Sequence, residues 1–397
     1  MPPADQADPS PEFIDTPEAL TSFCAALKGR EWIALDTEFL REKTYYPQLC
    51  LVQIGVPGRY ACIDPLALPD LAPLYDILYD DSVTKVLHAC AQDLEIFVHL
   101  TGRVPTPIFD TQLAAPLLGL PEQTGYGNFV KEVLGIELDK LHARTDWSRR
   151  PLSGAQLAYA ADDVRYLAEA YPLVIERLGD KGRLGWLAAE FEPYESLERY
   201  QMQPRDAWKR MRGLEKLRPK ALSIAQHLAA WREQQAQDKN LPRNWVVKDE
   251  VIIDLARLAP KQPEGLAGIR GMPAKTVQRY GATLLELIRT GADAEPQPLA
   301  GRTRRSRPSV QEEALADVLH AQLRLLADRH DINLAIIAGR KDLIALIRDD
   351  HTALLSGWRR EIAGKALLAL RDGERLVSIR KGRVEIEAAT RRPTETH

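Results

Sequence analysis

The hydrophobic pattern changes its period along the chain. The first 200 residues combine short apolar runs with longer stretches of helical period. The short runs predict four strands, at 31–38, 48–55, 59–64 and 83–89. The longer stretches predict helices, at 71–79, 92–100, 111–118, 127–134 and 153–178. Strands that come first and then alternate with helices indicate a mixed sheet with flanking helices, which is an α/β domain.

Beyond residue 200 the strand signal ends and only helical periodicity remains. A first block of helices is expected at 205–217, 220–238, 247–258 and 274–288. A segment with Gly, Pro and the arginines Arg302, Arg304, Arg305 and Arg307 follows, and it is typical of a linker. More helices are expected at 310–328, 333–336, 340–349 and 352–371, and the chain after Val384 is expected to be loose.

These patterns predict an α/β domain followed by two all-α helical bundle domains. The expected boundaries are 1–200 for the α/β domain, 201–291 for the first bundle, 292–308 for the basic linker, 309–385 for the second bundle and 386–397 for the tail.

Charge divides the chain at the same place. The formal net charge is −3, but residues 1–200 hold 17 Lys and Arg against 31 Asp and Glu, whereas residues 201–397 hold 36 against 25. An acidic half can gather cations, and a basic half can bind a polyanion. The alternative is a drift of surface charge between domains that has no function.

The overall composition is that of an ordinary globular protein, with 45% hydrophobic and 27% charged residues. No apolar run is long enough to cross a bilayer, and the first residues lack the basic start and apolar core of a signal peptide. The cysteines (Cys24, Cys50, Cys62 and Cys90) are not closely paired, so reduced core residues of a cytoplasmic protein are expected.

Three acidic elements are candidates for chemistry. Asp36 and Glu38 stand two apart in an apolar strand, so both side chains point to one face. Converging carboxylates repel each other unless a cation neutralises them, and oxygen ligands suit Mg²⁺ or Mn²⁺. Asp93 opens a helix after a buried strand, and Tyr159 and Asp163 stand one turn apart on the long helix. Taken singly, each has an ordinary alternative: a solvated strand end, an acid that stabilises a helix dipole, or a packed tyrosine.

Together these elements resemble the DEDD superfamily of 3′→5′ exonucleases, in its tyrosine branch. The matching pattern is Asp-x-Glu on a first strand, Asp at a strand-to-helix turn and Tyr-x₃-Asp on a late helix. The segments 44–49 (TYYPQL) and 150–152 (RPL) are similar to the ribonuclease D family, and the two helical blocks are similar to HRDC domains (helicase and ribonuclease D C-terminal), the second being more divergent. The resemblance implies a ribonuclease H-like exonuclease domain followed by two HRDC domains.

The resemblance also implies an activity. It is a metal-dependent 3′→5′ exoribonuclease that trims the 3′ ends of structured RNA, such as tRNA precursors, and releases nucleoside 5′-monophosphates. Two divalent ions, Mg²⁺ or Mn²⁺, would be held by the four carboxylates Asp36, Glu38, Asp93 and Asp163. Tyr159 would orient the attacking water. The partner would be RNA with a free 3′-OH end, and no membrane or obligate protein partner is implied.

A further set of residues is a candidate for substrate contact: Phe39, Gln48, Arg149, Arg150, Lys209, Arg210, Lys275 and Arg279. The basic members of the helical blocks could bind phosphates irrespective of sequence. For Phe39 and Gln48 strand packing is the alternative, and for Arg149 and Arg150 it is pairing with acids.

Four other residues have structural readings of their own. Trp231 is expected in the helical core, whereas Trp245 could stack on a base. His88 is expected to pack rather than to bind metal, and Asp110 is expected to cap a helix.

Two rival functions stay open on the sequence. One is a DNA 3′→5′ exonuclease, although no P-loop of an attached helicase is present. The other is an inactive RNA-binding scaffold, which would have no reason to keep repelling acids together.

Overall fold

A six-stranded mixed sheet forms the centre of the first half of the protein in the computed structural model, which describes residues 10–138, 145–299 and 307–389. The strands β1 to β6 comprise Glu12–Ile14, Trp32–Leu40, Gln48–Val56, Arg59–Ile63, Thr84–Leu87 and Ile108–Asp110. They are ordered β1-β4-β3-β2-β5-β6. The strands β2, β3 and β4 are antiparallel neighbours, whereas β1, β5 and β6 pair in parallel. The predicted mixed sheet is confirmed.

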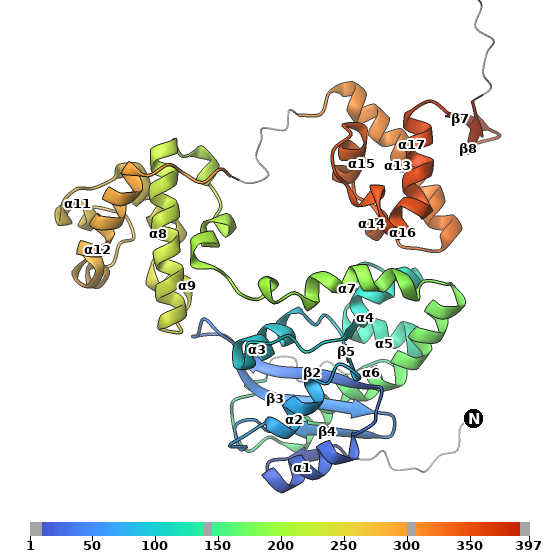
Figure 1. Ribbon diagram of the computed structural model, residues 1–397, viewed down its shortest axis with the longest axis horizontal. Coiled ribbons are helices and arrows are strands. Elements are labelled where there is room, and N and C mark those ends of the chain that lie inside the picture. Colours follow the sequence, from blue (N-terminus) through green and yellow to red (C-terminus); the bar gives the residue numbers. More distant parts are fainter. Residues whose placement is uncertain (1–9, 139–144, 300–306, 390–397) are drawn as a thin grey trace, which may run out of the picture.

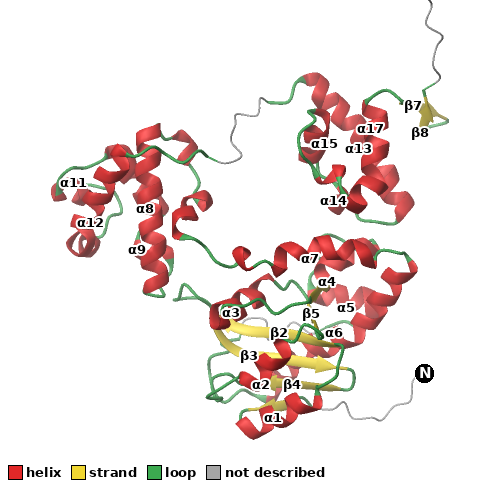
Figure 2. Ribbon diagram, viewed as in Figure 1, coloured by secondary structure: helices red, strands yellow, loops and turns green. Residues whose placement is uncertain are grey.

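Helices flank this sheet (Figure 2). They are α1 (Pro17–Ala26), α2 (Ala72–Leu78), α3 (Ala91–Thr101), α4 (Thr111–Ala114), α5 (Tyr126–Leu134), α6 (Gly154–Asp180) and α7 (Leu187–Glu195). The short elements β1 and β6 and the helices α1 and α7 were not expected from the sequence. The long helix begins as expected, because Ser153 and Gln156 form a capping box.

Helix α6 lies very close to strand β3. A Cβ atom added to Gly55 would be 2.6 Å from the carbonyl oxygen of Val164, so only glycine allows this approach. Val164 directly follows Asp163. The contact therefore fixes the distance between the sheet and the part of α6 that carries Asp163.

The first helical block has a hydrophobic core of its own, to which Leu228, Leu255 and Leu284 belong. Its helices are α8 (Pro219–Asp238), α9 (Arg243–Val246), α10 (Asp249–Leu258), α11 (Pro263–Ala267) and α12 (Ala274–Asp293). The continuous helix expected at 205–217 is wrong. Two short 3₁₀ helices, η4 (Pro204–Arg210) and η5 (Leu214–Lys216), occur there because Gly213 between them takes a left-handed conformation with φ +86°.

The second helical block comprises α13 (Val310–His330), α14 (Leu334–Ile337), α15 (Arg340–Ile347), η6 (Ala353–Leu355), α16 (Gly357–Arg359), a π-helical turn (Arg360–Gly364) and α17 (Lys365–Arg371). The single helix expected at 352–371 is therefore wrong. The chain bends at Gly357, whose φ is +55°, and it packs so tightly at Gly364 that a Cβ there would collide with the carbonyl oxygen of Leu354.

The chain is also ordered from Val384 to Ala388, where it was expected to be loose, and strand structure does not end at residue 200. A hairpin of β7 (Arg375–Arg380) and β8 (Arg383–Ala388) follows the last helix. Its residues are mostly exposed and rich in charge, so no apolar run marked it. The linker arginines Arg302, Arg304 and Arg305 lie outside the described residues. Within the described ranges, no helix is both long and apolar enough to cross a membrane.

The first helical block lies beside the loop between β2 and β3 (Figure 1), and Tyr45 of this loop joins the two units. The Tyr45 hydroxyl donates to the fully buried carboxylate of Glu233, which also pairs with Arg243 at 2.5 Å. Asn240 accepts hydrogen bonds from the backbone N–H groups of Tyr45 and Tyr46, at 3.0 and 2.9 Å. Tyr45 thus belongs to the core of the helical block.

The second block is attached at a different place, against α6 and α7. Trp358 stacks on Trp186 with ring centroids 5.0 Å apart, and Arg359 forms a two-bonded ion pair with Glu190, at 2.6 and 3.0 Å. The side chain of Arg183 donates to backbone carbonyls of both units. Each helical block is therefore fixed to the sheet unit by specific polar and aromatic contacts.

Candidate active site

Strand β2 carries the first two carboxylates. Asp36 is paired with Gln53 of β3 and Glu38 with Leu51, so both side chains lie on one face of the sheet. The register shifts between Glu38 and Phe39, and this bulge ends the regular pairing directly after the second carboxylate.

The turn before α3 places Asp93. Ala89 in this turn has φ +63°, a left-handed conformation that is costly for a residue other than glycine. The carboxylate of Asp110 holds it, accepting the N–H groups of Ala89 and Cys90 at 3.0 and 2.9 Å. Asp110 also caps α4 through the N–H of Gln112 at 2.8 Å, as predicted. Asp93 then lies in the first turn of α3.

Helix α6 brings Tyr159 and Asp163 to the same place, one turn apart. The hydroxyl of Tyr126 donates to the backbone carbonyl of Asp163 at 2.5 Å and to that of Asp162 at 3.0 Å. The ring of Trp147 stacks near Tyr159, with centroids 6.4 Å apart. Tyr126 was not expected from the sequence, since nothing in its neighbourhood at the start of α5 indicates a contact with α6.

The charges of these carboxylates act on one another. Burial, and then the charges of Asp163, Asp93 and Glu38, raise the pKa of Asp36 well above its usual range. Burial and the same two aspartates raise the pKa of Glu38 to about 8. The pKa values of Asp93 and Asp163 are both raised to about 7, chiefly by burial. The four predicted ligands are therefore close enough for their charges to interact, and full ionisation of the cluster at neutral pH is unfavourable without a compensating cation.

The donor set fits a hard divalent cation in charge and chemistry, because every predicted ligand is a carboxylate. A cavity of about 210 Å³ lies beside the cluster and is lined by Asp36, His88, Tyr126, Asp163 and Leu167. One oxygen of Asp93 accepts the hydroxyl of Thr37 at 2.5 Å. In the part of the chain that the structure describes, no three His, Cys, Asp or Glu side chains are already arranged to hold a metal ion.

His88 has the packing role expected of it. Its Nδ1 lies 2.9 Å from the hydroxyl of Thr111, and its Nε2 lies 2.9 Å from the carbonyl oxygen of Thr124. Both ring nitrogens are thus engaged by neighbouring segments, and burial lowers the pKa of the imidazole.

Arg149 and Arg150 are both engaged by acids. Arg150 binds the buried carboxylate of Asp64 with two bonds, at 2.5 and 2.7 Å, and donates to the carbonyl of Cys50. Arg149 pairs with Asp146 at 3.0 Å. Of their two interpretations, pairing with acids is the one the geometry favours.

The remaining substrate candidates are spread over four elements, β2, β3, η4 and α12. On β2 and β3, Phe39 is half-buried against the core and Gln48 is exposed. Lys209 pairs with Asp206 at 2.6 Å, whereas Arg210 lines a separate, larger cavity. Lys275 and Arg279 are exposed on α12.

Trp231 and Trp245, the two tryptophans that the sequence analysis interpreted, lie in the first helical block. Trp231 is half-buried and packs edge-on against Tyr280, as its core interpretation requires. Trp245 is 60% exposed.

Comparisons with known proteins agree with this architecture. A family model described as 3′-5′ exonuclease matches residues 11–176, and a model of the HRDC domain matches residues 221–288. Ribonuclease D of Nitrobacter hamburgensis is 39% identical over 377 residues, which covers 94% of this chain and 98% of that protein. Ribonuclease D of Sphingobium indicum is 40% identical over 384 residues, with 94% and 98% covered.

A solved structure is similar over the same range. The crystal structure of Escherichia coli RNase D, described as an exoribonuclease involved in structured RNA processing, has a TM-score of 0.78 and 33% identity, covering 91% of this chain and 98% of that one. The chain belongs to the ribonuclease D family and is a 3′→5′ exoribonuclease.

Proposed function

We propose that Asp36, Glu38, Asp93 and Asp163 bind two divalent cations, Mg²⁺ or Mn²⁺, and that this cluster is where RNA is cut. The observation that supports this most directly is the raised pKa of all four carboxylates, which burial causes first and, for Asp36, Glu38 and Asp163, the charges of neighbouring carboxylates add to. Such an arrangement is costly without a cation and becomes favourable when one binds. Bound divalent ions would activate a water molecule and stabilise the leaving 3′ oxygen.

The protein's own residues would position the reacting groups. Burial and the nearby carboxylates raise the pKa of Tyr159, so its phenol stays protonated at neutral pH. A protonated phenol is a hydrogen-bond donor and acceptor and not a base, and Tyr159 therefore orients the attacking water. Tyr126 would hold the backbone at Asp163 in place through its hydrogen bonds to α6.

The proposed substrate is the 3′ end of structured RNA such as tRNA precursors, released as nucleoside 5′-monophosphates. The acidic half supplies the cation site, and the basic half, with its HRDC match, supplies affinity for phosphates. We include in this proposal a second, divergent HRDC-like domain at 309–385. The four cysteines are free and buried, which supports work in the reducing cytoplasm.

The test removes one ligand at a time. Asp36→Asn and Asp163→Asn should lower hydrolysis of a 5′-labelled RNA by several orders of magnitude and weaken Mn²⁺ binding, measured by electron paramagnetic resonance. Circular dichroism should show an unchanged fold. Asp162→Asn is the matched control, since this neighbouring side chain is 42% exposed and should leave activity intact. Full activity of Asp36→Asn would refute the assignment.

Matched RNA and DNA oligonucleotides should be compared in the same assay. Faster degradation of RNA is expected, and a preference for DNA would favour the rival exonuclease function.

A further inference from the structure

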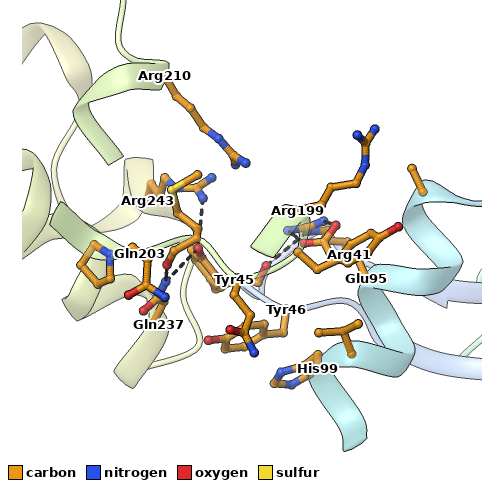
Figure 3. A pocket seen from close by; sticks show the side chains of 16 residues that line it. Arg41, Tyr45, Tyr46, Glu95, His99, Arg199, Gln203, Arg210, Gln237 and Arg243 are labelled. Carbon is orange, nitrogen blue, oxygen red and sulfur yellow. Dashed lines mark hydrogen bonds and ion pairs between the residues drawn. The ribbon is translucent and has the colours of Figure 1, made fainter. Parts of the chain in front are cut away.

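A cavity of about 970 Å³ lies where the sheet unit meets the first helical block. Its walls come from the end of β2, helix α3, residues 199–204 and side chains of the helical block (Figure 3). A second cavity, of about 420 Å³, is lined by four of the same residues: Arg41, Tyr45, Arg210 and Arg243. The two cavities adjoin the same four side chains, and we call them together the junction pocket.

The junction pocket contains positive charge that the protein does not neutralise. Arg41 pairs with Glu95 at 2.8 Å, and Arg243 pairs with Glu233. In contrast, the guanidinium groups of Arg199 and Arg210 form no ion pair or hydrogen bond with any residue in the described ranges. Figure 3 shows both side chains extending into the open space of the pocket.

Arg199 is well suited to hold a phosphate. Its guanidinium lies over the ring of Tyr194, 3.9 Å from the centroid. This stacking fixes the plane of the group and leaves its N–H donors free at the edge, where they match the oxygens of a phosphate.

Aromatic surfaces accompany this charge. Tyr46 and His99 stack face to face in the wall of the pocket, with centroids 3.7 Å apart and an angle of 7° between the rings. The exposed Trp245 follows Arg243 and Asn244, which line the second cavity. Cationic groups combined with flat rings are typical of surfaces that bind single-stranded nucleic acid.

The pocket is close to the carboxylate cluster along the chain. Ala91 lines the pocket, and Asp93 lies two residues later on the same helix. Arg41 follows Asp36 by five residues, which is at most about 17 Å of extended strand. An RNA strand whose 3′ end is at the cluster can therefore reach the pocket with nucleotides that precede this end.

We propose that the junction pocket binds the backbone of the RNA substrate upstream of the nucleotide being removed. Arg199 and Arg210 bind phosphates, and the paired rings of Tyr46 and His99 support a base. This inference rests on the proposed function, because it takes the carboxylate cluster as the place of cutting. It explains why the first helical block is held against the sheet unit at Tyr45.

Binding of RNA by the full-length protein tests the proposal directly. A labelled oligoribonucleotide of about 12 nucleotides is titrated in EDTA, which prevents cleavage, and its fluorescence anisotropy is followed. The double variant Arg199→Gln/Arg210→Gln should bind on the order of tenfold more weakly at low salt. Its plot of log K against log salt should be shallower by about 1.4, since two phosphate contacts are lost.

Arg205→Gln is the matched control. Arg205 is on the same 3₁₀ helix as Arg210, its side chain is 80% exposed, and it does not line the pocket. This variant should bind RNA as the unmodified protein does. Equal weakening by Arg205→Gln would assign the effect to general surface charge and overturn the proposal.

Hydrolysis separates this proposal from the proposed function. The double variant should lose kcat/KM on the longer RNA and lose much less of it on a dinucleotide, which has a single nucleotide upstream of the cleaved bond. Wild-type protein that cleaves neither substrate would refute the proposed function, while the binding measurement would still decide on the pocket. Unchanged RNA binding by the double variant would overturn the proposal that the junction pocket binds RNA. An acidic protein would then be the alternative occupant.

Discussion

Glu38→Gln should stabilise the protein in the absence of metal at pH 8. The pKa of Glu38 in the folded protein is about 8, raised from 4.5 by burial and by Asp163 and Asp93. Between these two pH values the folded state binds more protons at this group than the unfolded state does. The free energy of unfolding of the metal-free protein must therefore fall as pH rises from about 4.5 to about 8. Glutamine resembles the protonated carboxyl and removes this dependence.

The magnitude follows from the shift. A pKa change of this size corresponds to at most about 5 kcal/mol at pH 8. Glu38 keeps some solvent contact and its neighbours share their protons with it, so we expect about 1–3 kcal/mol. For a protein unit of this size, that is a rise of about 2–10 °C in Tm.

Differential scanning fluorimetry at pH 5 and pH 8, with EDTA or Mn²⁺, measures these effects. Mn²⁺ should raise the Tm of the wild type more than that of Glu38→Gln, because the variant lacks one of the proposed ligands. Glu132→Gln, an exposed position on α5, is the control and should leave both values unchanged. The reasoning is wrong if Glu38→Gln lowers the metal-free Tm at pH 8, or if the wild-type Tm does not fall between the two pH values.

Other positions give equally specific expectations. Gly55→Ala should cost about 1–3 kcal/mol in urea unfolding and lower kcat, since the new Cβ forces α6 off the sheet at Val164. Tyr126→Phe should cost about 1 kcal/mol and lower kcat severalfold with KM unchanged, because it frees the backbone at Asp163. Arg243→Met should cost about 3–5 kcal/mol in urea unfolding of the first helical block, since the buried Glu233 loses its partner.

For each of these three variants, one outcome would contradict the reason given for the prediction. Gly127→Ala, on α5 with open space around it, should be tolerated, and equal damage there would show that the α6 contact is not the cause. A Tyr126→Phe variant with wild-type kcat would separate this hydroxyl from the site. An Arg243→Met variant whose stability rises at pH 8 would mean that Glu233 is not charged in the folded protein.

Local sequence patterns were sufficient to predict candidate residues that lie together on a single strand or helix. Asp36 and Glu38 follow from the period of a strand, and Tyr159 and Asp163 follow from the turn of a helix. Contacts between residues that are far apart in the chain produce no such local sequence pattern. Arg150 and Asp64 are 86 residues apart, and Tyr45 enters the core of a helical block that begins far along the chain.

The lack of a local sequence pattern also explains why the β7–β8 hairpin and the role of Tyr126 were not predicted. Strand β7 carries arginines at both ends and exposes most of its apolar residues, so burial did not shape its sequence. Tyr126 is important through its hydroxyl, which reaches two carbonyl groups on another helix, and carbonyl groups have no sequence signature.

The carboxylate of Asp110 has a consequence for mutational scanning. It is 1% exposed, and backbone N–H groups of the Ala89–Cys90 turn and of α4 occupy both its oxygens. A screen that scores activity alone would rank Asp110 beside the proposed metal ligands, because its loss releases the turn that positions Asp93. Excess Mn²⁺ offers a way to tell them apart, since mass action can rescue a weakened ligand but cannot rebuild a turn. Asp110 would thus be recognised as a residue that supports the structure of the site and not as a fifth acid that binds metal.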